Sequence, residues 1–401
     1  KKMKNHYKVI DEEKVKNKKI IMRVDFNVPM KGSKILDDTR IRRVIPGLKI
    51  LAKSAKQIFL ITHFGRPKGA VSKDLSVQPL QDYLRRALSC NVGFLPYVDE
   101  PSKLKEKADK EEKICLLENC RFYPGEEKND LDLARSYANI ADIYVNDAFS
   151  CSHRAHASIQ SITRFLPSYA GPVLAAELKA LANTLENPTR PFAAFVGGAK
   201  ISTKLSILEN LISKVDKLLL AGAMANTFLA AKQIPVGASL FEPNLIQTAN
   251  MILDLAKEKK CQIILPIDAV VSKSLQAGGV SDTRVNGMVK DDEMILDIGV
   301  ESIALFKKHI GQSRTLLWNG PAGAFEIAPY DLGTKSLGEY IGKRTSTGYL
   351  QSVAGGGDTV AAVNLGGAGN EISYLSLAGG AFLEWMEGKI LPGIEALNIT
   401  N

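Results

Sequence analysis

Two glycines and two lysines form the most suggestive short pattern in the chain. Residues 194–204 have the sequence AFVGGAKISTK, in which Lys200 and Lys204 follow the pair Gly197 and Gly198. Lysines four positions apart share one face of a helix, and backbone amides at a helix start can bind phosphate. The chain lacks the GxxxxGK[ST] pattern, and it lacks GxGxxG followed by a ribose-binding acid, so neither common nucleotide motif applies. A tight strand-to-helix turn with two solvated lysines explains this stretch alone equally well.

A second group of candidate residues is cationic and lies in the first 160 residues, with Asp25 and Asn27 among them. The cationic members follow apolar runs and are Arg40, His63, Arg66, Arg121, His153, Arg154 and His156. Arginine binds carboxylate and phosphate through paired hydrogen bonds, so the set suits a small substrate with several negative charges. For any single arginine a surface ion pair is the better explanation, whereas the set as a whole favours a binding site.

The second half of the chain carries two glycine-rich openings to helices, SVAGGGDTVAA and SLAGGAFLEW. Each can present backbone N–H groups to a phosphate. The residues concerned are Gly356, Gly357, Asp358, Thr359, Gly379 and Gly380. Asp358 suits a helix N-cap, and it equally suits Mg²⁺ that carries nucleotide phosphates, since such an ion needs only one or two carboxylates. This half has no serine, cysteine or histidine set that resembles a nucleophile with its base, which favours direct transfer between two bound substrates.

These polar clusters all follow short apolar runs, and the runs indicate how the chain must position them. Eight such runs are KKIIMRV, QIFLI, KICLL, DIYV, FAAFV, KLLL, QIIL and TLLW. Runs of this kind, separated by helical segments, predict parallel strands buried on both faces and therefore an α/β fold. Ligands of open parallel sheets bind outside the carboxyl ends of the strands, where nearly every polar cluster falls. Residues 173–187 are expected to form a helix between two domains, because the stretch starts after Gly-Pro and ends at Asn-Pro.

Length and composition limit the remaining choices. A chain of 401 residues is expected to form two domains, and 45% hydrophobic with 24% charged residues is typical of a soluble globular protein. No apolar run is long enough to span a membrane and no secretory signal is evident, so a cytoplasmic protein is expected. Eight lysines and three acids in residues 1–19 supply +5 of the net charge of +9, which argues against a nucleic-acid-binding groove. The five cysteines lack metal-ligand spacing and are expected to be reduced thiols.

Ten motifs resemble, in order and across essentially the whole chain, those of the phosphoglycerate kinase family. They are MRVDFNVP, DDTRIR, THFGRPKG, LLENCRF, NDAFSCSHRAHAS, VGGAKISTK, AGAMANTFL, WNGPAGAFE, GGGDT and AGGAFLEWMEGKILPG. The resemblance implies a two-domain kinase with Rossmann-like, doubly wound parallel sheets, an active site in the cleft between the domains, and hinge bending. It implies an N-terminal phosphoglycerate-binding domain of residues 1–172 plus 390–401, and a nucleotide-binding domain of residues 173–389. The implied reaction is reversible phosphoryl transfer between 1,3-bisphosphoglycerate and ADP in glycolysis, with Mg²⁺ as cofactor and a monomeric enzyme in the cytoplasm.

The same resemblance assigns roles to individual residues. For phosphoglycerate binding it implies Asp25, Phe26, Asn27, Arg40, His63, Phe64, Gly65, Arg66, Arg121 and Arg154. For nucleotide binding it implies Gly197, Gly198, Lys200, Lys204, Asn319, Pro321, Glu326, Gly356, Gly357, Asp358 and Thr359, with Glu326 at the ribose and Asp358 at Mg²⁺. For catalysis it implies Arg40, Lys200, Lys204, Gly379 and Gly380.

One position departs from the family pattern, and two other functions compete with the kinase. Where the family usually has Ser-Thr before the last glycine pair, this chain has Ser376-Leu377, so a role for that hydroxyl is in doubt. The segment EISYLSL is expected to be a buried strand in which Leu377 packs inward.

A nicotinamide dehydrogenase would also have an α/β fold, but its dinucleotide motif is missing. A non-catalytic nucleotide-binding or scaffolding protein would be expected to lose the cationic set or Asp358, and this chain keeps both.

Overall fold

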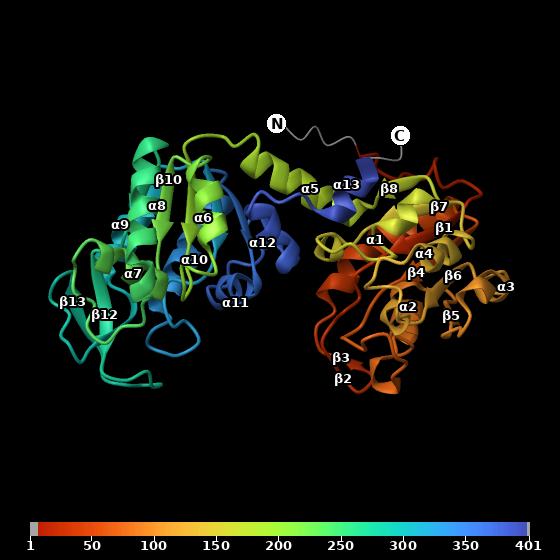
Figure 1. Ribbon diagram of the computed structural model, residues 1–401, viewed down its shortest axis with the longest axis horizontal. Helices are drawn as coiled ribbons and strands as arrows, with labels where there is room; N and C mark the ends of the chain where they lie inside the picture. Colours follow the sequence, from red (N-terminus) through yellow and green to blue (C-terminus); the bar gives the residue numbers. More distant parts are fainter. Residues whose placement is uncertain (1–6, 399–401) are drawn as a thin grey trace. The chain divides into compact units, whose positions relative to one another are not determined.

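The computed structural model describes residues 7–398, and the chain divides into two compact units (Figure 1). One unit contains the chain up to Lys179 together with the segment from Ile390, and the other is Ala180–Lys389. Helix α5 (Pro172–Leu185) runs from the first unit into the second. It corresponds to the helix expected over residues 173–187. The predicted domain boundary after residue 172 lies at the start of this helix, whereas the units divide within it, after Lys179.

The first unit is built on a six-stranded parallel sheet with the order β5-β6-β4-β1-β7-β8. The strands are β1 (Lys19–Arg23), β4 (Gln57–Ile61), β5 (Gly93–Leu95), β6 (Ile114–Leu117), β7 (Ile143–Asn146) and β8 (Ser168–Ala170). The helices are α1 (Thr39–Ser54), α2 (Leu80–Leu88), α3 (Leu104–Ala108), α4 (Leu131–Ala138) and α13 (Pro392–Asn398). A two-stranded hairpin, β2 (Met30–Lys31) with β3 (Lys34–Ile35), precedes α1.

Alternating strand residues of this sheet form a buried core with α1 and α2. Ile20 and Met22 of β1 and Ile58 of β4 pack in one apolar cluster with Leu48 of α1 and Leu84 of α2. The intervening residues of the same strands are buried too, because both faces of a doubly wound sheet are covered by helices. This explains why the strands appear in the sequence as uninterrupted apolar runs.

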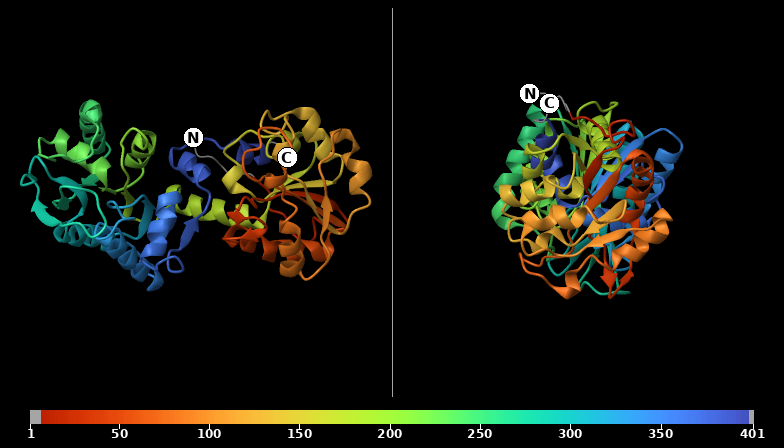
Figure 2. Two further views of the ribbon diagram at one scale, coloured as in Figure 1. Left: turned by 90° about the horizontal axis from the view of Figure 1, so that it is seen from below. Right: turned by 90° about the vertical axis from the view of Figure 1, so that its right-hand side faces the viewer.

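The second unit repeats the plan with the strand order β11-β10-β9-β15-β16-β17, again all parallel. The strands are β9 (Phe192–Val196), β10 (Lys217–Leu220), β11 (Gln262–Ile264), β15 (Thr315–Asn319), β16 (Gln351–Gly355) and β17 (Tyr374–Ser376). The helices are α6 (Leu205–Ile212), α7 (Ala223–Ala231), α8 (Ile246–Glu258), α9 (Val300–Gly311), α10 (Leu332–Ser346), α11 (Gly357–Leu365) and α12 (Gly380–Met386). In the left view of Figure 2, green helices and blue helices of this unit lie on opposite sides of its strands.

A small antiparallel sheet, which the sequence patterns did not predict, is added to this unit. Its order is β13-β12-β14, with strands β12 (Asp268–Ser272), β13 (Asp282–Val285) and β14 (Met294–Ile298). Its strands lack a long apolar run, because one face stays partly exposed to solvent.

All eight apolar runs singled out in the sequence coincide with strands of the two parallel sheets, so the predicted α/β class is confirmed. The five cysteines are free thiols, of which only Cys90 is exposed. Among the described residues, none of the helices has both the length and the apolar character that crossing a bilayer would require.

Candidate functional site

In each parallel sheet, the first strand of the unit lies inside the sheet, and later strands lie on both sides of it. In the first unit β1 lies between β4 and β7, and in the second unit β9 lies between β10 and β15. The loops that leave β1 and β7 run toward opposite edges of their sheet, and so do the loops that leave β9 and β15. A crevice therefore forms outside the carboxyl ends of these strands. The predicted substrate residues follow β1, β4, β6 and β7, and many of the predicted nucleotide residues follow β9, β15 and β16.

In the first unit, Asp25 fixes the position of Arg40. Asp25 follows β1 and is buried, while Arg40 is the second residue of α1. The Arg40 Nη1 atom donates to Asp25 Oδ2 at 2.9 Å and to the Asn27 carbonyl oxygen at 3.1 Å. The Ser150 hydroxyl donates to the same carboxylate oxygen. About a third of the Arg40 side chain, 35%, stays exposed, so the carboxylate orients a guanidinium that still faces solvent.

Asn27 and Arg121 hold the loop that follows β4. The Gly65 amide donates to Asn27 Oδ1 at 3.1 Å, and Arg121 Nη1 donates to the Gly65 carbonyl at 2.9 Å. Gly65 has φ +60°, and a Cβ atom there would lie 2.7 Å from Leu75, so this turn requires glycine. Arg121 is buried, which makes the planar guanidinium a fixed feature of the loop.

The remaining predicted substrate residues lie at the same carboxyl ends. The Phe26 amide donates to Thr62 Oγ1 at 3.0 Å, and the Phe64 amide donates to Asn119 Oδ1 at 3.2 Å. Arg66 and Arg154 are exposed, after β4 and after β7 respectively. The loops after four strands therefore present the predicted cations on one end of one sheet.

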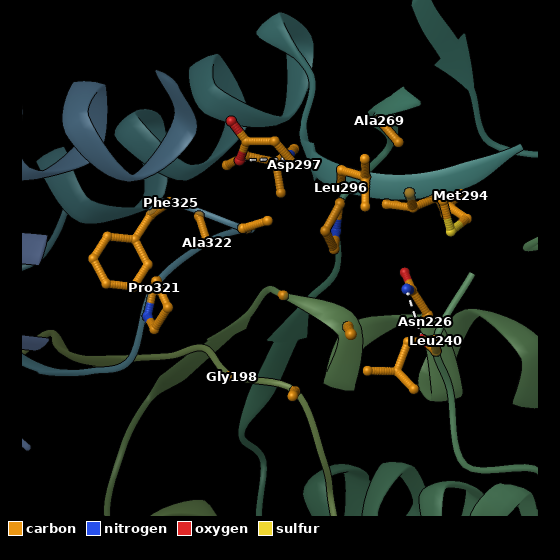
Figure 3. A pocket seen from close by; sticks show the side chains of 18 of the residues that line it. Gly198, Asn226, Leu240, Ala269, Met294, Leu296, Asp297, Pro321, Ala322 and Phe325 are labelled. Carbon is orange, nitrogen blue, oxygen red and sulfur yellow. Dashed lines mark hydrogen bonds between the residues drawn. The ribbon is translucent and has the colours of Figure 1, made fainter. Parts of the chain in front are cut away.

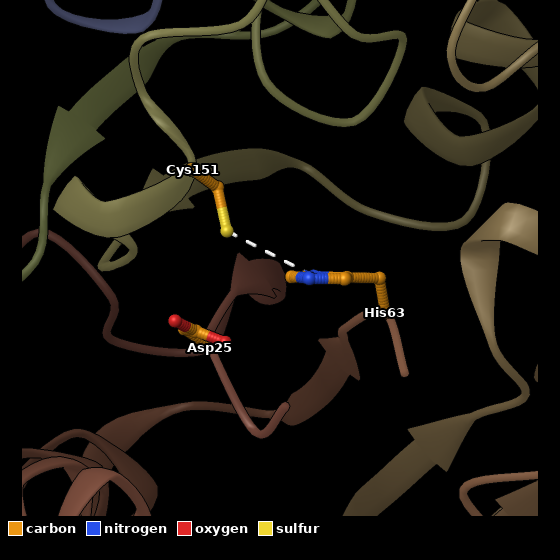
Figure 4. Close-up of side chains that lie close together, drawn as sticks. All are labelled: Asp25, His63 and Cys151. Atoms are coloured by element: carbon orange, nitrogen blue, oxygen red, sulfur yellow. Dashed lines mark hydrogen bonds between the residues drawn. The ribbon is translucent and has the colours of Figure 1, made fainter. Parts of the chain in front are cut away.

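His63 forms a tight buried cluster with Asp25 and Cys151, whose polar atoms lie within 4.8 Å of one another (Figure 4). These residue types can bind a metal ion, but their atoms are already used in hydrogen bonds. Asp25 accepts from Arg40 and Ser150, and the Cys151 thiol lies 3.8 Å from His63 Nδ1. Burial, reinforced by the positive charges of neighbouring arginines, holds the pKa of His63 well below its usual range. Because Asp25 is paired with Arg40 and His63 is neutral, the positive charge beside this cluster comes from the neighbouring arginines, which suit an anion.

In the second unit, close backbone contact joins the loops after β9 and β15. The Gly197 amide donates to the Asn319 carbonyl at 2.8 Å, and a Cβ atom on Gly197 would lie 1.8 Å from the Pro321 carbonyl oxygen. The Asn319 side chain accepts from Lys204 Nζ and donates to the Gly355 carbonyl at 2.8 Å. Burial lowers the pKa of Lys204, and the negative charge of Asp358 opposes that shift. Asn319 thus connects the lysine to the loop after β16.

The prediction that Lys200 and Lys204 lie on one face of a helix is wrong. Helix α6 begins only at Leu205, and both lysines belong to the turn before it. Within this turn the Ser202 amide donates to Glu242 Oε2 at 3.2 Å and its hydroxyl donates to Glu242 Oε1 at 2.5 Å, so the turn is tied to a distant part of the chain. Lys200 is consequently exposed, whereas Lys204 is half-buried beside Asn319.

The GGGDT motif opens helix α11 in the predicted manner, but Asp358 is not its N-cap. The N-cap is Gly356, with φ +99°, and Asp358 is exposed in the first helical turn. Thr359 is buried, and its hydroxyl accepts from the Gly320 amide at 2.8 Å. Asp358 is thus left on the surface as a carboxylate that can bind a cation, while Thr359 serves the structure of the loop.

A cavity of about 470 Å³ lies beside these loops (Figure 3). It is lined by four of the predicted nucleotide residues, namely Gly198, Pro321, Glu326 and Asp358. Figure 3 shows that much of the remaining wall is apolar, and the side chains that form it include Leu240, Ala269, Met294, Leu296 and Phe325. The sequence patterns gave no sign of these residues, because several come from the unpredicted sheet of β12 and β14. An apolar cavity bordered by glycine-rich turns suits a ligand with a flat apolar part and a phosphate part.

The last glycine pair begins a short helix, and Leu377 lies just outside the strand that precedes it. Gly379 is the N-cap of α12, with φ +54°, and Gly380 is its first residue. The predicted strand EISYLSL is shorter than expected, since β17 covers only Tyr374–Ser376. Leu377 is half-buried and lies one residue after β17, so the expectation that it is the last residue of a buried strand is wrong. A chain that must turn into the left-handed conformation at Gly379 leaves the sheet two residues earlier.

Comparison with known proteins gives one consistent result. The family model described as phosphoglycerate kinase matches residues 10–389. A phosphoglycerate kinase of Methylorubrum extorquens is 50% identical over 388 residues, which cover 96% of this chain and 97% of that relative. One of a Ruegeria species is 50% identical over 393 residues, which cover 98% of this chain and 99% of that relative. The solved structure of phosphoglycerate kinase from Coxiella burnetii is similar with a TM-score of 0.88 and 38% identity, over 96% of both chains.

Proposed function

The chain belongs to the phosphoglycerate kinase family, and on this basis we propose how its residues perform the family reaction. In that reaction a phosphoryl group passes reversibly from 1,3-bisphosphoglycerate to ADP, giving 3-phosphoglycerate and ATP. The observation that carries the assignment of sites is the separation of chemistry between the units. The first unit gathers arginines at the carboxyl ends of its strands, and the second combines an apolar cavity with glycine-rich turns.

Phosphoglycerate binds to the strand ends of the first unit in this proposal. Arg121 is held rigidly by Gly65 and suits a group that stays anionic throughout the reaction. Arg40 is anchored by Asp25 and keeps an exposed part of its guanidinium, which suits the moving phosphoryl group. Arg66 and Arg154 add exposed positive charge at the same strand ends.

The nucleotide binds to the second unit in this proposal. The base occupies the apolar cavity, Glu326 binds the ribose, and the turns at Gly198 and Gly356 receive the phosphates. Mg²⁺ fits the exposed Asp358 carboxylate, because this ion commonly takes one or two protein carboxylates and completes its shell with phosphate oxygens and water. When bound, Mg²⁺ neutralises part of the phosphate charge.

Transfer is direct in this proposal. An oxygen of the ADP β-phosphate attacks phosphorus in line while the bond to the carboxyl oxygen breaks, and the carboxylate leaves with its electron pair. Arg40, Lys200, Lys204 and the amides of Gly379 and Gly380 stabilise charge on the transferring group. No covalent enzyme intermediate is involved. The monomeric state and the cytoplasmic location stay predictions, which size-exclusion chromatography with light scattering and cell fractionation would test.

A coupled assay tests the proposed function most directly. With 3-phosphoglycerate, ATP and Mg²⁺ present, we expect turnover that requires all three components. The absence of turnover under these conditions would defeat the enzyme assignment and favour a nucleotide-binding scaffold. Nicotinamide oxidation without added coupling enzyme would instead favour the dehydrogenase alternative.

Transfer between ligands held by different units requires that the units approach each other. We therefore expect small-angle scattering to give a smaller radius of gyration with 3-phosphoglycerate and a non-reactive ATP analogue together than with either ligand alone. Identical profiles in all four ligand states would contradict this prediction.

Leu377→Thr is expected to change kcat by less than about tenfold, which corresponds to roughly 1.4 kcal/mol of barrier. The reason is that phosphate binding at this turn depends on the amides after Gly379, which the side chain at 377 does not supply. Steady-state kinetics of the two proteins measure the difference. If the threonine variant restored activity to an inactive parent, the family hydroxyl would be essential for catalysis.

A further inference from the structure

Arg23 is a fully buried arginine that the sequence patterns did not assign to the site. It is the last residue of β1 and lies two positions before Asp25. Its guanidinium makes three contacts of hydrogen-bond length. Nε donates to Ser158 Oγ at 2.8 Å, Nη1 donates to the Val24 carbonyl at 2.5 Å, and Nη2 lies 3.2 Å from His63 Nδ1.

The contact between Arg23 and His63 determines which nitrogen of the imidazole carries the proton. A guanidinium has N–H donors and no acceptor, so His63 Nδ1 must accept the hydrogen bond. In a neutral imidazole one ring nitrogen accepts and the other bears the proton. The proton therefore resides on Nε2. The Cys151 thiol, 3.8 Å from Nδ1, is compatible with this arrangement because it also can donate.

Arg23 is itself oriented by a buried acid through Ser158. Glu126 is fully buried, and its Oε1 accepts from the Ser158 hydroxyl at 2.5 Å, while its Oε2 accepts from the Ser158 amide at 3.2 Å. Because the Ser158 proton points to Glu126, the hydroxyl lone pairs face Arg23 Nε. A continuous buried chain of hydrogen bonds thus runs from Glu126 through Ser158 and Arg23 to His63. It ends at the cluster that His63 forms with Asp25 and Cys151.

We propose that Arg23 is a positioning residue that holds His63 as the neutral Nε2–H tautomer, so that Nε2 donates a hydrogen bond to an oxygen of the phosphoglycerate. This role rests on the proposed function for its ligand, whereas the tautomer is a property of the free protein. His63 then acts as a directional neutral donor, and the positive charge of the site comes from arginines alone.

The charges around His63 agree with a neutral ring. Burial, followed by the positive charges of Arg23, Arg121 and Arg40, lowers the pKa of His63, so the neutral ring is favoured at pH 7. Asp25 and Cys151 face the ring as well, but Asp25 is paired with Arg40. Burial, followed by the positive charges of Arg121, Arg23 and Arg154, lowers the pKa of His156 to about 3, so this neighbour is neutral too. Near pH 7 we therefore expect no contribution to phosphoglycerate affinity from a protonated His63.

Long-range ¹H–¹⁵N NMR of the ligand-free protein tests the tautomer without reference to activity. For His63 we expect a protonated Nε2 and an unprotonated Nδ1 at pH 7. A spectrum with Nδ1 protonated, or an imidazolium at pH 7, overturns the proposal. Absence of kinase turnover would instead defeat the proposed function and leave the tautomer result standing.

The double variant Arg23→Met with Glu126→Gln tests the positioning role. It removes the charges of Arg23 and Glu126 together, so neither of these two side chains is left as an uncompensated buried ion. We expect a mixture of His63 tautomers and a KM for 3-phosphoglycerate raised about tenfold, with kcat changed by less than about threefold. Tyr144→Phe is the matched control, because Tyr144 donates to the Ser158 carbonyl at 2.8 Å in the same buried region. This variant should lower the free energy of unfolding and leave the His63 tautomer and the KM for 3-phosphoglycerate unchanged.

Substitutions of His63 test the same point without disturbing Arg23. Glutamine can place an amide N–H near the position of Nε2, whereas asparagine is shorter and reaches only the position of Nδ1. We expect both variants to raise KM for 3-phosphoglycerate, and we expect His63→Asn to raise it about tenfold more than His63→Gln does. The reverse order, or an unchanged KM in both variants, overturns the proposal even if the double variant fails to fold.

Discussion

Arg40→Ala is expected to lower kcat by about 100-fold or more, which corresponds to roughly 2.7 kcal/mol of lost transition-state stabilisation. Arg40 is held by Asp25 at 2.9 Å and keeps 35% of its side chain exposed, so its guanidinium can meet charge that develops on the transferring group. An interaction that strengthens in the transition state appears in kcat more than in KM. Steady-state kinetics with 3-phosphoglycerate and ATP provide both parameters.

Arg121→Ala is the matched comparison for this first prediction. Arg121 is buried and fixed by the Gly65 carbonyl at 2.9 Å, so we assign it to ground-state binding. Its loss should chiefly raise the KM for 3-phosphoglycerate. If the two variants changed kcat and KM in the same proportion, the division of roles between these arginines would be wrong.

Gly197→Ala is expected to be the most damaging single-methyl change in the second unit. The added Cβ atom would lie 1.8 Å from the Pro321 carbonyl oxygen and 2.7 Å from its carbon, so the loops after β9 and β15 would have to separate. We expect a loss of about 3 kcal/mol in the free energy of unfolding and a Tm lower by roughly 10 °C. The KM for ATP should rise about tenfold, because Gly198 and Pro321 both line the cavity. Calorimetry and steady-state kinetics measure the two effects.

Gly357→Ala is the stability control for that variant. A Cβ atom on Gly357 would meet no heavy atom within 4 Å, and its φ is not in the left-handed region. Alanine at the start of α11 should leave Tm unchanged or raise it slightly. Equal losses of Tm in both variants would show that close packing at Gly197 is not the cause.

The strands could be predicted because the strands of a parallel sheet covered on both faces appear in the sequence as uninterrupted apolar runs. FAAFV and TLLW are apolar without interruption, and both became central strands of the second unit. Polar residues directly after such runs had to lie at the carboxyl ends of the strands. This reasoning located Asp25 and Gly197 correctly without any knowledge of side-chain contacts.

The details that failed depend on contacts between distant parts of the chain. Lys200 and Lys204 have helical spacing, but Ser202 bonds to Glu242, which lies forty positions away, and the helix starts later. Arg23 lies inside an apolar run and gives no signal of its own, because its partners Ser158 and His63 come from other loops. The wall of the cavity was missed for the same reason, since strands of mixed polarity such as β14 have no clear periodicity.

The chain returns to its first unit at α13, and this return affects the order in which the two units can fold during translation. Helix α13 belongs to that unit, where the Gly393 amide donates to the Ser152 carbonyl at 2.8 Å and a Cβ atom on Gly393 would lie 2.7 Å from Ile159. The residues from Ala180 to Lys389 form one uninterrupted segment, so the second unit can complete its fold as soon as that segment has emerged. The first unit, although translated earlier, must wait for α13 before the loop that carries Cys151 and Arg154 gains its last support. The first unit therefore depends on a segment that is translated after the whole of the second unit.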